Sequence, residues 1–239
     1  DDSGFVIFKD VSRENLIEKL ILLDVTDSDE LKSNANKYIV DNFGVNGAQI
    51  TGFGGSGSQY KYADINAYTN SVKFCPDILL IMLGTNDATK WDDAKYLYER
   101  EFKKLIKSYQ EIFPVSEIVL MTSPATMNNN NFGIPNDKIK EFVNPLQKKL
   151  ASDLKLPLID IREAFETKQG GYESLIRPND GVHFSVEGAQ FVAEEVAKAI
   201  SKGLANYLID FEYENPINKI GNFIIEEEND FSNVDEIIG

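Results

Sequence analysis

The sequence contains very little histidine and cysteine. Its 239 residues include one histidine, His183, and one cysteine, Cys75. A single cysteine excludes an internal disulfide and a cysteine-based metal cluster. We predict no metal site and no cofactor, and we expect Cys75, which precedes a proline at the entrance of a strand, to be buried packing.

Positive charge is also scarce. The chain has 24 lysines and arginines against 39 aspartates and glutamates, a net charge of −15. Such a surface repels phosphate backbones and anionic lipids, so nucleic-acid and membrane partners are not expected. No apolar run has the length of a membrane span, and no basic segment followed by an apolar one begins the chain. We expect a soluble protein, cytoplasmic or secreted with its signal already removed; the oligomeric state is left open.

Short apolar runs alternate with amphipathic segments along the chain. Apolar runs rich in β-branched or aromatic residues predict strands at 5–8, 38–43, 78–83, 117–121 and 156–160. Helical periodicity predicts helices near 13–20, 26–37, 60–73, 93–112, 136–154 and 161–167, and a last long helix that opens at Ser185. Strands joined by crossover helices form a parallel sheet covered on both faces. We predict a three-layer α/β/α flavodoxin-like sandwich with a five-stranded parallel sheet, formed by residues 1–205.

Two segments lie outside this regular pattern. Residues 206–239 form an acidic C-terminal extension, in which 207–213 alternate like a strand and 223–225 are apolar, so a strand or hairpin is predicted there. The asparagine tract 128–131 is predicted to belong to a long loop with no packing value of its own.

Polar residues with possible chemical roles follow three of the predicted strands. Asp180 precedes His183 by three positions, so a loop can bring the carboxylate to the imidazole, fix its tautomer and stabilise the imidazolium. A pair with this spacing is also a common capping arrangement or surface hydrogen bond. Gly47 follows the second strand, and Asn86, within Gly84-Thr85-Asn86-Asp87, follows the third. Because ligands bind outside the carboxyl ends of parallel strands, we expect these residues to converge on one edge of the sheet.

Taken together, the motif at 84–87 and the pair Asp180 and His183 resemble the SGNH (GDSL-type) esterase and acylhydrolase family. The likeness runs from about residue 38 to residue 200 and is strongest with carbohydrate acetylesterase-like members. The resemblance implies that Gly47 and Asn86 form an oxyanion hole, and that Asp180 and His183 activate a serine. Preorganised donors stabilise the developing oxyanion, and the loss of one typically costs about 3 kcal/mol.

The serine of the family's first block, Gly-Asp-Ser, is not present as such. After the first strand the chain reads Lys9-Asp10-Val11-Ser12, and the spacing from Ser12 to Gly47 suits the family, so Ser12 is the predicted nucleophile. The alternatives are Ser28, which lies closer to Gly47 than the family's intervening helix requires, and Ser56 and Ser58 in the glycine-rich segment 52–58. Ser12 and Ser28 are also well placed to be helix N-caps.

The resemblance implies a serine esterase that removes acetyl or another short acyl group from a carbohydrate or small-molecule ester. The alternative is a catalytically impaired module of the same fold that binds a carbohydrate or acyl ligand. Trp91, Tyr60 and Tyr62 are predicted either to form a sugar-stacking wall or to pack in the interior.

Overall fold

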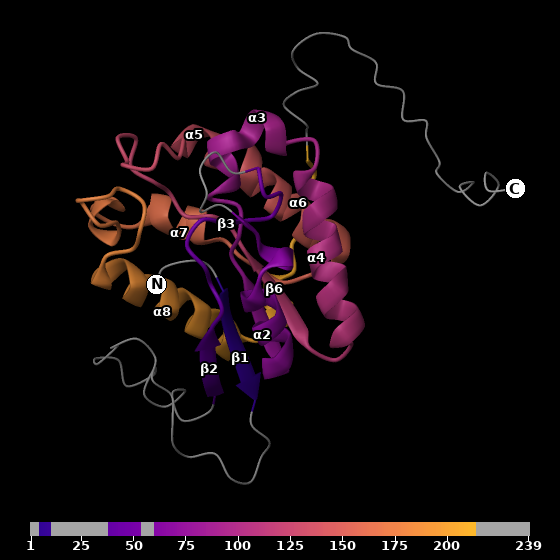
Figure 1. Cartoon of the computed structure of the whole chain (residues 1–239). Coiled ribbons are helices and arrows are strands. Elements are labelled where there is room, and N and C mark those ends of the chain that lie inside the picture. Colours follow the sequence, from indigo (N-terminus) through magenta and orange to yellow (C-terminus); the bar gives the residue numbers. More distant parts are fainter. Residues whose placement is uncertain (1–4, 11–37, 54–59, 214–239) are drawn as a thin grey trace, which may run out of the picture.

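A mixed sheet forms the centre of the computed structural model, which describes residues 5–10, 38–53 and 60–213 (Figure 1). The sheet has the strand order β2-β1-β5-β6-β7. Its strands are β1 (Phe5–Asp10), β2 (Tyr38–Asn42), β5 (Ile78–Ile81), β6 (Glu117–Met121) and β7 (Leu158–Ile159). Two further short strands, β3 (Ala48–Gln49) and β4 (Tyr60–Lys61), pair with each other in a separate sheet.

The central strands are buried on both faces. Leu79 and Ile81 of β5 belong to one hydrophobic cluster and Leu80 belongs to another, because successive side chains of a strand point to opposite faces. The first cluster packs against α2 (Asn66–Phe74), α4 (Tyr98–Ile112) and α6 (Asn144–Leu154). The second packs against α7 (Ile161–Thr167) and α8 (Val186–Lys202), which lie on the other side of the sheet (Figure 1). The described chain is thus an α/β protein with helices on both faces of its sheet.

The direction of β1 corrects the predicted sheet. β5, β6 and β7 pair in parallel, as expected, but β1 is antiparallel to both of its neighbours, with Phe8 opposite Ile78 and Asp10 opposite Tyr38. The prediction of a wholly parallel sheet is therefore wrong at β1, because an apolar run indicates a buried strand without indicating its direction. The carboxyl ends of β2, β5, β6 and β7 share one edge of the sheet, and β1 ends at the opposite edge.

Several helix boundaries also differ from the predictions. Tyr60 and Lys61 pair with β3, so the helix expected from residue 60 starts only at Asn66. The helix expected over 93–112 is divided into α3 (Trp91–Ala94) and α4. The helices expected at 13–20 and 26–37 lie outside the described residues.

The helix predicted over 136–154 is present and widens in its middle. It consists of α5 (Asn136–Lys138), a π-helical segment (Ile139–Val143) and α6. Pro145 in the first turn of α6 has no N–H to donate to the preceding turn, and its ring would clash with a carbonyl there. A wider π turn before the proline accommodates that missing donor.

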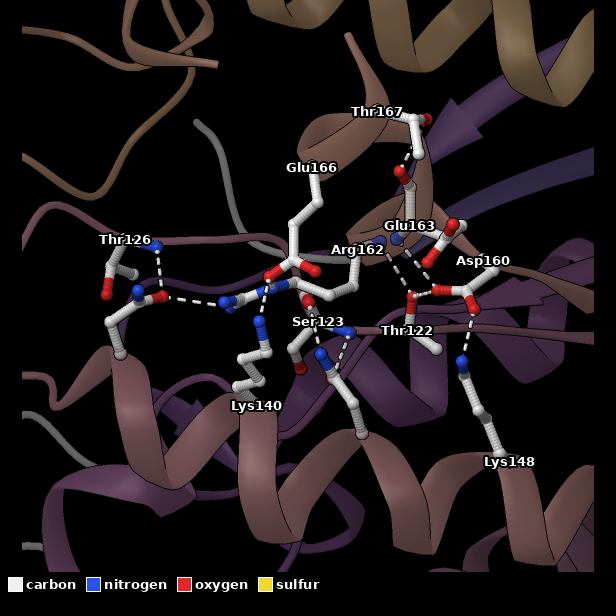
Figure 2. Close-up of polar contacts among 12 residues, drawn as sticks. Thr122, Ser123, Thr126, Lys140, Lys148, Asp160, Arg162, Glu163, Glu166 and Thr167 are labelled. Atoms are coloured by element: carbon white, nitrogen blue, oxygen red, sulfur yellow. Dashed lines mark hydrogen bonds and ion pairs between the residues drawn. The ribbon is translucent and has the colours of Figure 1, made fainter. Parts of the chain in front are cut away.

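Polar side chains join the carboxyl ends of β6 and β7 to the helices that follow (Figure 2). The Thr122 hydroxyl donates to Oδ1 of Asp160 at 2.8 Å and accepts the backbone N–H of Arg162 at 2.9 Å. Asp160 in turn caps α7 by accepting the Glu163 N–H at 3.1 Å. These contacts fix the start of α7 against the end of β6.

The start of α8, which follows the His183 loop, is as predicted. The Ser185 hydroxyl accepts the Gly188 N–H at 3.0 Å, the usual contact of an N-cap. The same hydroxyl donates to the carbonyl of Ser174 at 2.6 Å. Ser185 therefore ties the end of the His183 loop both to its helix and to the preceding segment.

The described part of the C-terminal extension runs along the domain without forming the expected strand over 207–213. Leu208 makes one isolated antiparallel bridge with Pro157, and the Phe211 N–H donates to the Ser152 hydroxyl at 3.0 Å. Residues 223–225 lie outside the described residues, and the domain boundary at 205 stays a prediction. No helix of the described ranges is long and apolar enough to cross a membrane.

Cys75 is exposed, so the expectation of a buried thiol is wrong. Cys75 ends α2 with a left-handed backbone, φ 54°. The next residue, Pro76, takes the buried position at the entrance of β5. A residue that terminates a helix in this conformation turns the chain, and here the turn leaves the cysteine side chain outside.

Candidate active site

A cavity lies at the edge of the sheet where β5 and β6 end. Its lining comes from residues 46–48, 82–86 and 182–184 together with Pro124. Gly47, Asn86 and His183, which are remote in sequence, all contribute to this lining. The structure therefore brings three of the predicted site residues together, and Asp180 joins them through its contact with His183.

Asp180 uses its two carboxylate oxygens for different partners. Oδ1 accepts the backbone N–H groups of Val182 at 2.8 Å and His183 at 2.9 Å, which closes the turn. Oδ2 lies 3.1 Å from Nδ1 of His183. Burial alone would raise the pKa of Asp180, but the two backbone N–H groups and the imidazole outweigh it and hold the pKa below its ordinary value. The carboxylate is therefore ionised at neutral pH.

An ionised carboxylate at Nδ1 determines the tautomer of His183. A carboxylate can only accept, so the proton of the neutral ring resides on Nδ1 and Nε2 carries the lone pair. The His183 side chain is 25% exposed, so the ring is accessible from the cavity side. This arrangement suits a general base, which needs an accessible basic nitrogen and a fixed orientation.

Asn86 is tied to the segment that carries Gly47. Its Nδ2 donates to the Ala48 carbonyl at 3.1 Å, and the backbone carbonyl of Asn86 accepts from Nε2 of Gln49 at 2.9 Å. An amide NH2 group has two hydrogens, and within the described ranges the second one makes no hydrogen bond. Gly47 has a left-handed backbone, φ 76°, which glycine adopts without strain.

Asp87 is a site-supporting residue whose role the sequence did not reveal. It is fully buried, and its carboxylate accepts the Ile50 N–H at 2.9 Å, the Thr51 N–H at 2.9 Å and the Thr51 hydroxyl at 2.7 Å. Burial raises the pKa of Asp87 to about 6, against the lowering effect of these donors. The carboxylate thus joins the end of β5 to the segment after Gly47. Its position next to Asn86 in the sequence was the one feature that could have indicated this role.

Gly84 makes close packing possible below the cavity. Its backbone has φ 136°, and a Cβ there would lie 2.3 Å from the Tyr98 hydroxyl and 2.7 Å from a methyl of Val143. The Tyr98 hydroxyl and Nε2 of Gln147 both donate to the Leu83 carbonyl, at 3.1 Å and 2.6 Å. Only glycine fits between these groups, and they fix the backbone that leads into Asn86.

The asparagine tract also differs from its prediction. Asn131 donates its backbone N–H to the Asp180 carbonyl at 2.9 Å and its side chain to the Asn179 carbonyl at 2.6 Å. The expectation that this tract has no packing value is therefore wrong. Its contacts join segments 48 positions apart, which a reading of local composition cannot detect.

The predicted sugar-stacking wall is not formed by Trp91 or Tyr62. Trp91 is 4% exposed and stacks on Phe142 with 5.9 Å between ring centroids, and Tyr62 is fully buried. Both are core residues, the second of the two roles that the sequence allowed. The side chain of Tyr60 lies outside the described part of the structure.

The candidate nucleophiles Ser12, Ser28, Ser56 and Ser58 lie outside the described residues. In the described lining of the cavity, Thr85 has the only side-chain hydroxyl. Asp10, the last described residue of β1, lies at the edge opposite the cavity because β1 is antiparallel to β5. The assignment of Ser12 stays a prediction, and the direction of β1 counts against it.

The described ranges contain no group of three or more histidine, cysteine, aspartate or glutamate side chains that is arranged to hold a metal ion. The polar groups at the cavity are instead a histidine with its carboxylate and amide donors, a set that suits acyl transfer by a side-chain nucleophile.

Residues 6–196 match the family model described as GDSL-like Lipase/Acylhydrolase. The match covers most of the chain, which therefore belongs to this family of carboxylic ester hydrolases. The resemblance found in the sequence is thus confirmed.

One similar curated protein is an acetylxylan esterase from Xylanibacter ruminicola. It is 25% identical over 181 residues, which are 68% of this chain and 36% of that protein. The chain thus spans about a third of the length of this relative.

Similar solved structures include two carbohydrate esterases. A catalytic mutant of Axe2, an acetylxylan esterase from Geobacillus stearothermophilus, has a TM-score of 0.50 and 20% identity, with 72% of this chain and 77% of that chain covered. Est24, a carbohydrate acetylesterase from Sinorhizobium meliloti, has a TM-score of 0.50 and 18% identity, with 65% and 74% covered. At these identities the likeness concerns the fold.

Proposed function

We propose that the chain is a serine esterase that removes acetyl groups from a carbohydrate. The observation that carries the proposal is the cavity that Gly47, Asn86 and His183 line together, with Asp180 at Nδ1 of His183. The acetylxylan esterase relative supports an acetylated carbohydrate as substrate. The alternative, a binding module without catalysis, is not favoured by membership of a hydrolase family.

The proposed reaction follows from the chemistry of these groups. The serine Oγ attacks the ester carbonyl carbon while Nε2 of His183 takes the hydroxyl proton, and the C=O π electrons move to the oxygen. The Gly47 N–H and the second N–H of Asn86 stabilise this oxyanion. The tetrahedral intermediate then expels the sugar oxygen, which receives the proton from His183, and leaves an acetylated serine.

The second half of the reaction regenerates the enzyme. Water gives a proton to Nε2 of His183 and attacks the acetyl carbonyl, and the same donors stabilise the second oxyanion. Collapse breaks the bond to the serine oxygen, which recovers the proton from His183, and acetate leaves. Throughout, Asp180 orients the ring and stabilises its positive charge without taking a proton.

Ser12 is the nucleophile that sequence spacing favours, and the direction of β1 makes this a sharp test. Ser12 follows Asp10, the last residue of β1, by two positions, and two residues span at most about 7 Å. Phe8 already pairs with Ile78, and about 13 Å of strand separates Ile78 from the cavity residue Met82. Catalysis by Ser12 therefore requires β1 to run parallel to β5 in the active enzyme.

Labelling with a serine-reactive phosphonate, followed by peptide mapping, tests the proposal. We expect one modified serine in wild-type protein and strongly reduced labelling in His183→Ala, because the nucleophile depends on the imidazole. An adduct at Ser12 would show that β1 runs parallel to β5 in the active enzyme. An adduct at Ser28, Ser56 or Ser58 would show that this other serine is the nucleophile. Absence of any stoichiometric adduct, together with no hydrolysis of acetyl esters, would contradict the serine mechanism.

A further inference from the structure

The loop 127–134 is attached to the loop that carries Asp180 and His183. The Met127 N–H donates to the Gly181 carbonyl at 2.8 Å, and Asn131 donates to two carbonyls of the same loop. The backbones also touch: a Cβ on Gly181 would lie 2.9 Å from Cα of Asn130. The two loops therefore form one unit at the edge of the cavity.

Asn130 fixes the shape of loop 127–134 from within. Its Nδ2 donates to the carbonyls of Met127 at 2.8 Å and Ile134 at 2.7 Å. Its Oδ1 accepts the N–H groups of Phe132 at 3.2 Å and Ile134 at 2.9 Å. One side chain thus makes four hydrogen bonds to the backbone of Phe132 and of residues on either side of it, which restricts the backbone at the phenylalanine.

Phe132 lies directly against the imidazole of His183. The ring centroids are 5.2 Å apart and the planes are perpendicular. A perpendicular pair covers at most one face of the phenylalanine ring, and Phe132 is 51% exposed. An aromatic ring on a backbone held by Asn130 is therefore half exposed to solvent beside His183.

We propose that Phe132 is the platform on which the sugar ring of the substrate's alcohol side stacks. The inference rests on the proposed function, in which His183 protonates the departing sugar oxygen. That oxygen must lie within hydrogen-bond reach of Nε2, so groups beside the imidazole contact the alcohol rather than the acetyl group. The C–H face of a pyranose is apolar and matches an exposed phenylalanine ring.

Charge favours a neutral ligand at this position. The described lining of the cavity contains no lysine or arginine, and the chain has a net charge of −15. A phosphate or carboxylate on the alcohol would thus find no cationic side chain in the described lining of the cavity, and long-range repulsion would oppose it. An uncharged acetylated pyranoside meets neither obstacle.

Kinetics with two acetyl esters tests the platform through their ratio. The substrates are a methyl β-xylopyranoside acetate, which has a sugar ring, and ethyl acetate, which has none. We expect Phe132→Ala to lower kcat/KM for the sugar ester, relative to kcat/KM for ethyl acetate, by about threefold to tenfold. This is the change that the loss of one aromatic contact produces. Phe132→Trp should retain the ratio and Phe132→Leu should lose most of it. Equal losses on both esters would overturn the proposal and make Phe132 a residue that only positions His183.

A binding measurement separates this inference from the proposed function. His183 is the only histidine, so its ring signals in a 1H–13C NMR spectrum need no assignment. Unacetylated xylotriose should shift them in wild-type protein and in Tyr96→Ala, a control at an aromatic residue that is 73% exposed, and much less in Phe132→Ala. Shifts without any hydrolysis would support the platform and reject the esterase. No shift in wild-type protein at millimolar xylotriose would overturn the platform.

Discussion

Asp180 and His183 are joined by a carboxylate whose two oxygens have separate tasks. Oδ2 lies 3.1 Å from Nδ1 of His183, and Oδ1 accepts the N–H groups of Val182 and His183. The backbone turn and the imidazole are thus oriented by the same group. This geometry allows the structural and the chemical role of Asp180 to be tested apart.

Asp180→Asn should preserve the fold and abolish most of the activity. The oxygen of the new amide can still accept the two backbone N–H groups, but its NH2 then faces Nδ1 and favours the tautomer with the proton on Nε2. We expect kcat to fall by about 10⁴-fold, with the thermal midpoint nearly unchanged. Asp180→Ala, which also removes the acceptor of the turn, should lower both kcat and the midpoint. A fully active Asp180→Asn would contradict the assigned tautomer.

Asp87 should make the free energy of unfolding depend on pH. Its folded pKa of about 6 lies above the ordinary value of 3.8, so the folded state binds the proton more tightly than the unfolded state. The stabilisation of the folded state that comes from the protonated Asp87 is therefore fully present below pH 3.8, and it declines as the pH rises through about 6. Relative to Asp87→Asn, wild-type protein should lose up to about 3 kcal/mol over this range.

Urea unfolding of both proteins between pH 4 and pH 7, a range chosen around the folded pKa of Asp87, measures this difference. Asp92→Asn is the matched control, since it removes one negative charge at a side chain that is 81% exposed. Parallel pH profiles for wild-type protein and Asp87→Asn would show that Asp87 does not titrate in the folded state with a raised pKa.

Convergence of the site was predictable because strand ends share an edge. Gly47, Asn86 and His183 follow different strands, and the rule for parallel sheets places them together without any knowledge of side-chain contacts. The direction of β1 was not predictable, since the pairing partner and connection decide it. The burial of Trp91 was not predictable either, because it depends on Phe142, a residue remote in sequence.

The contacts of the asparagine tract and of Asp87 could not be predicted from the sequence for a related reason. Asn130 and Asn131 belong to a polar tract that reads as a solvated loop, and only the fold brings Gly181 and Asn179 against it. The pKa of Asp87 likewise depends on complete burial, which neighbouring residues in the sequence do not reveal. Local patterns indicate elements and motifs, whereas these contacts depend on how the elements pack.

Gly84→Ala should be severely destabilising. The added Cβ would lie 2.3 Å from the Tyr98 hydroxyl, and the backbone at φ 136° is unfavourable for any L side chain. We expect a loss of about 4 kcal/mol or more in the free energy of unfolding, measured by urea denaturation. Gly170→Ala is the control: φ is 87° and nothing lies within 4 Å, so only backbone strain remains, at about 1–2 kcal/mol. Similar losses in both variants would contradict the packing described around Gly84.

Thr122→Val should destabilise the junction of β6 and α7 (Figure 2). The substitution nearly preserves shape, but it leaves the Arg162 N–H without its acceptor and removes a donor to Asp160. A buried unsatisfied N–H costs about 1–3 kcal/mol, which should appear in the free energy of unfolding. Thr122→Ser retains the hydroxyl and should recover much of the loss. If the serine variant were as unstable as the valine variant, the methyl group rather than these hydrogen bonds would be responsible.

Hydrolysis of p-nitrophenyl acetate by wild-type protein and by His183→Ala shows whether His183 is the base of an esterase. His183 is the only imidazole in the chain, so no second histidine can substitute for it. We expect turnover by wild-type protein and a fall in kcat/KM of about a thousandfold or more in the variant, with its thermal midpoint retained. Equal rates in the two proteins, or no turnover by wild-type protein, would contradict an esterase that uses His183 as its base.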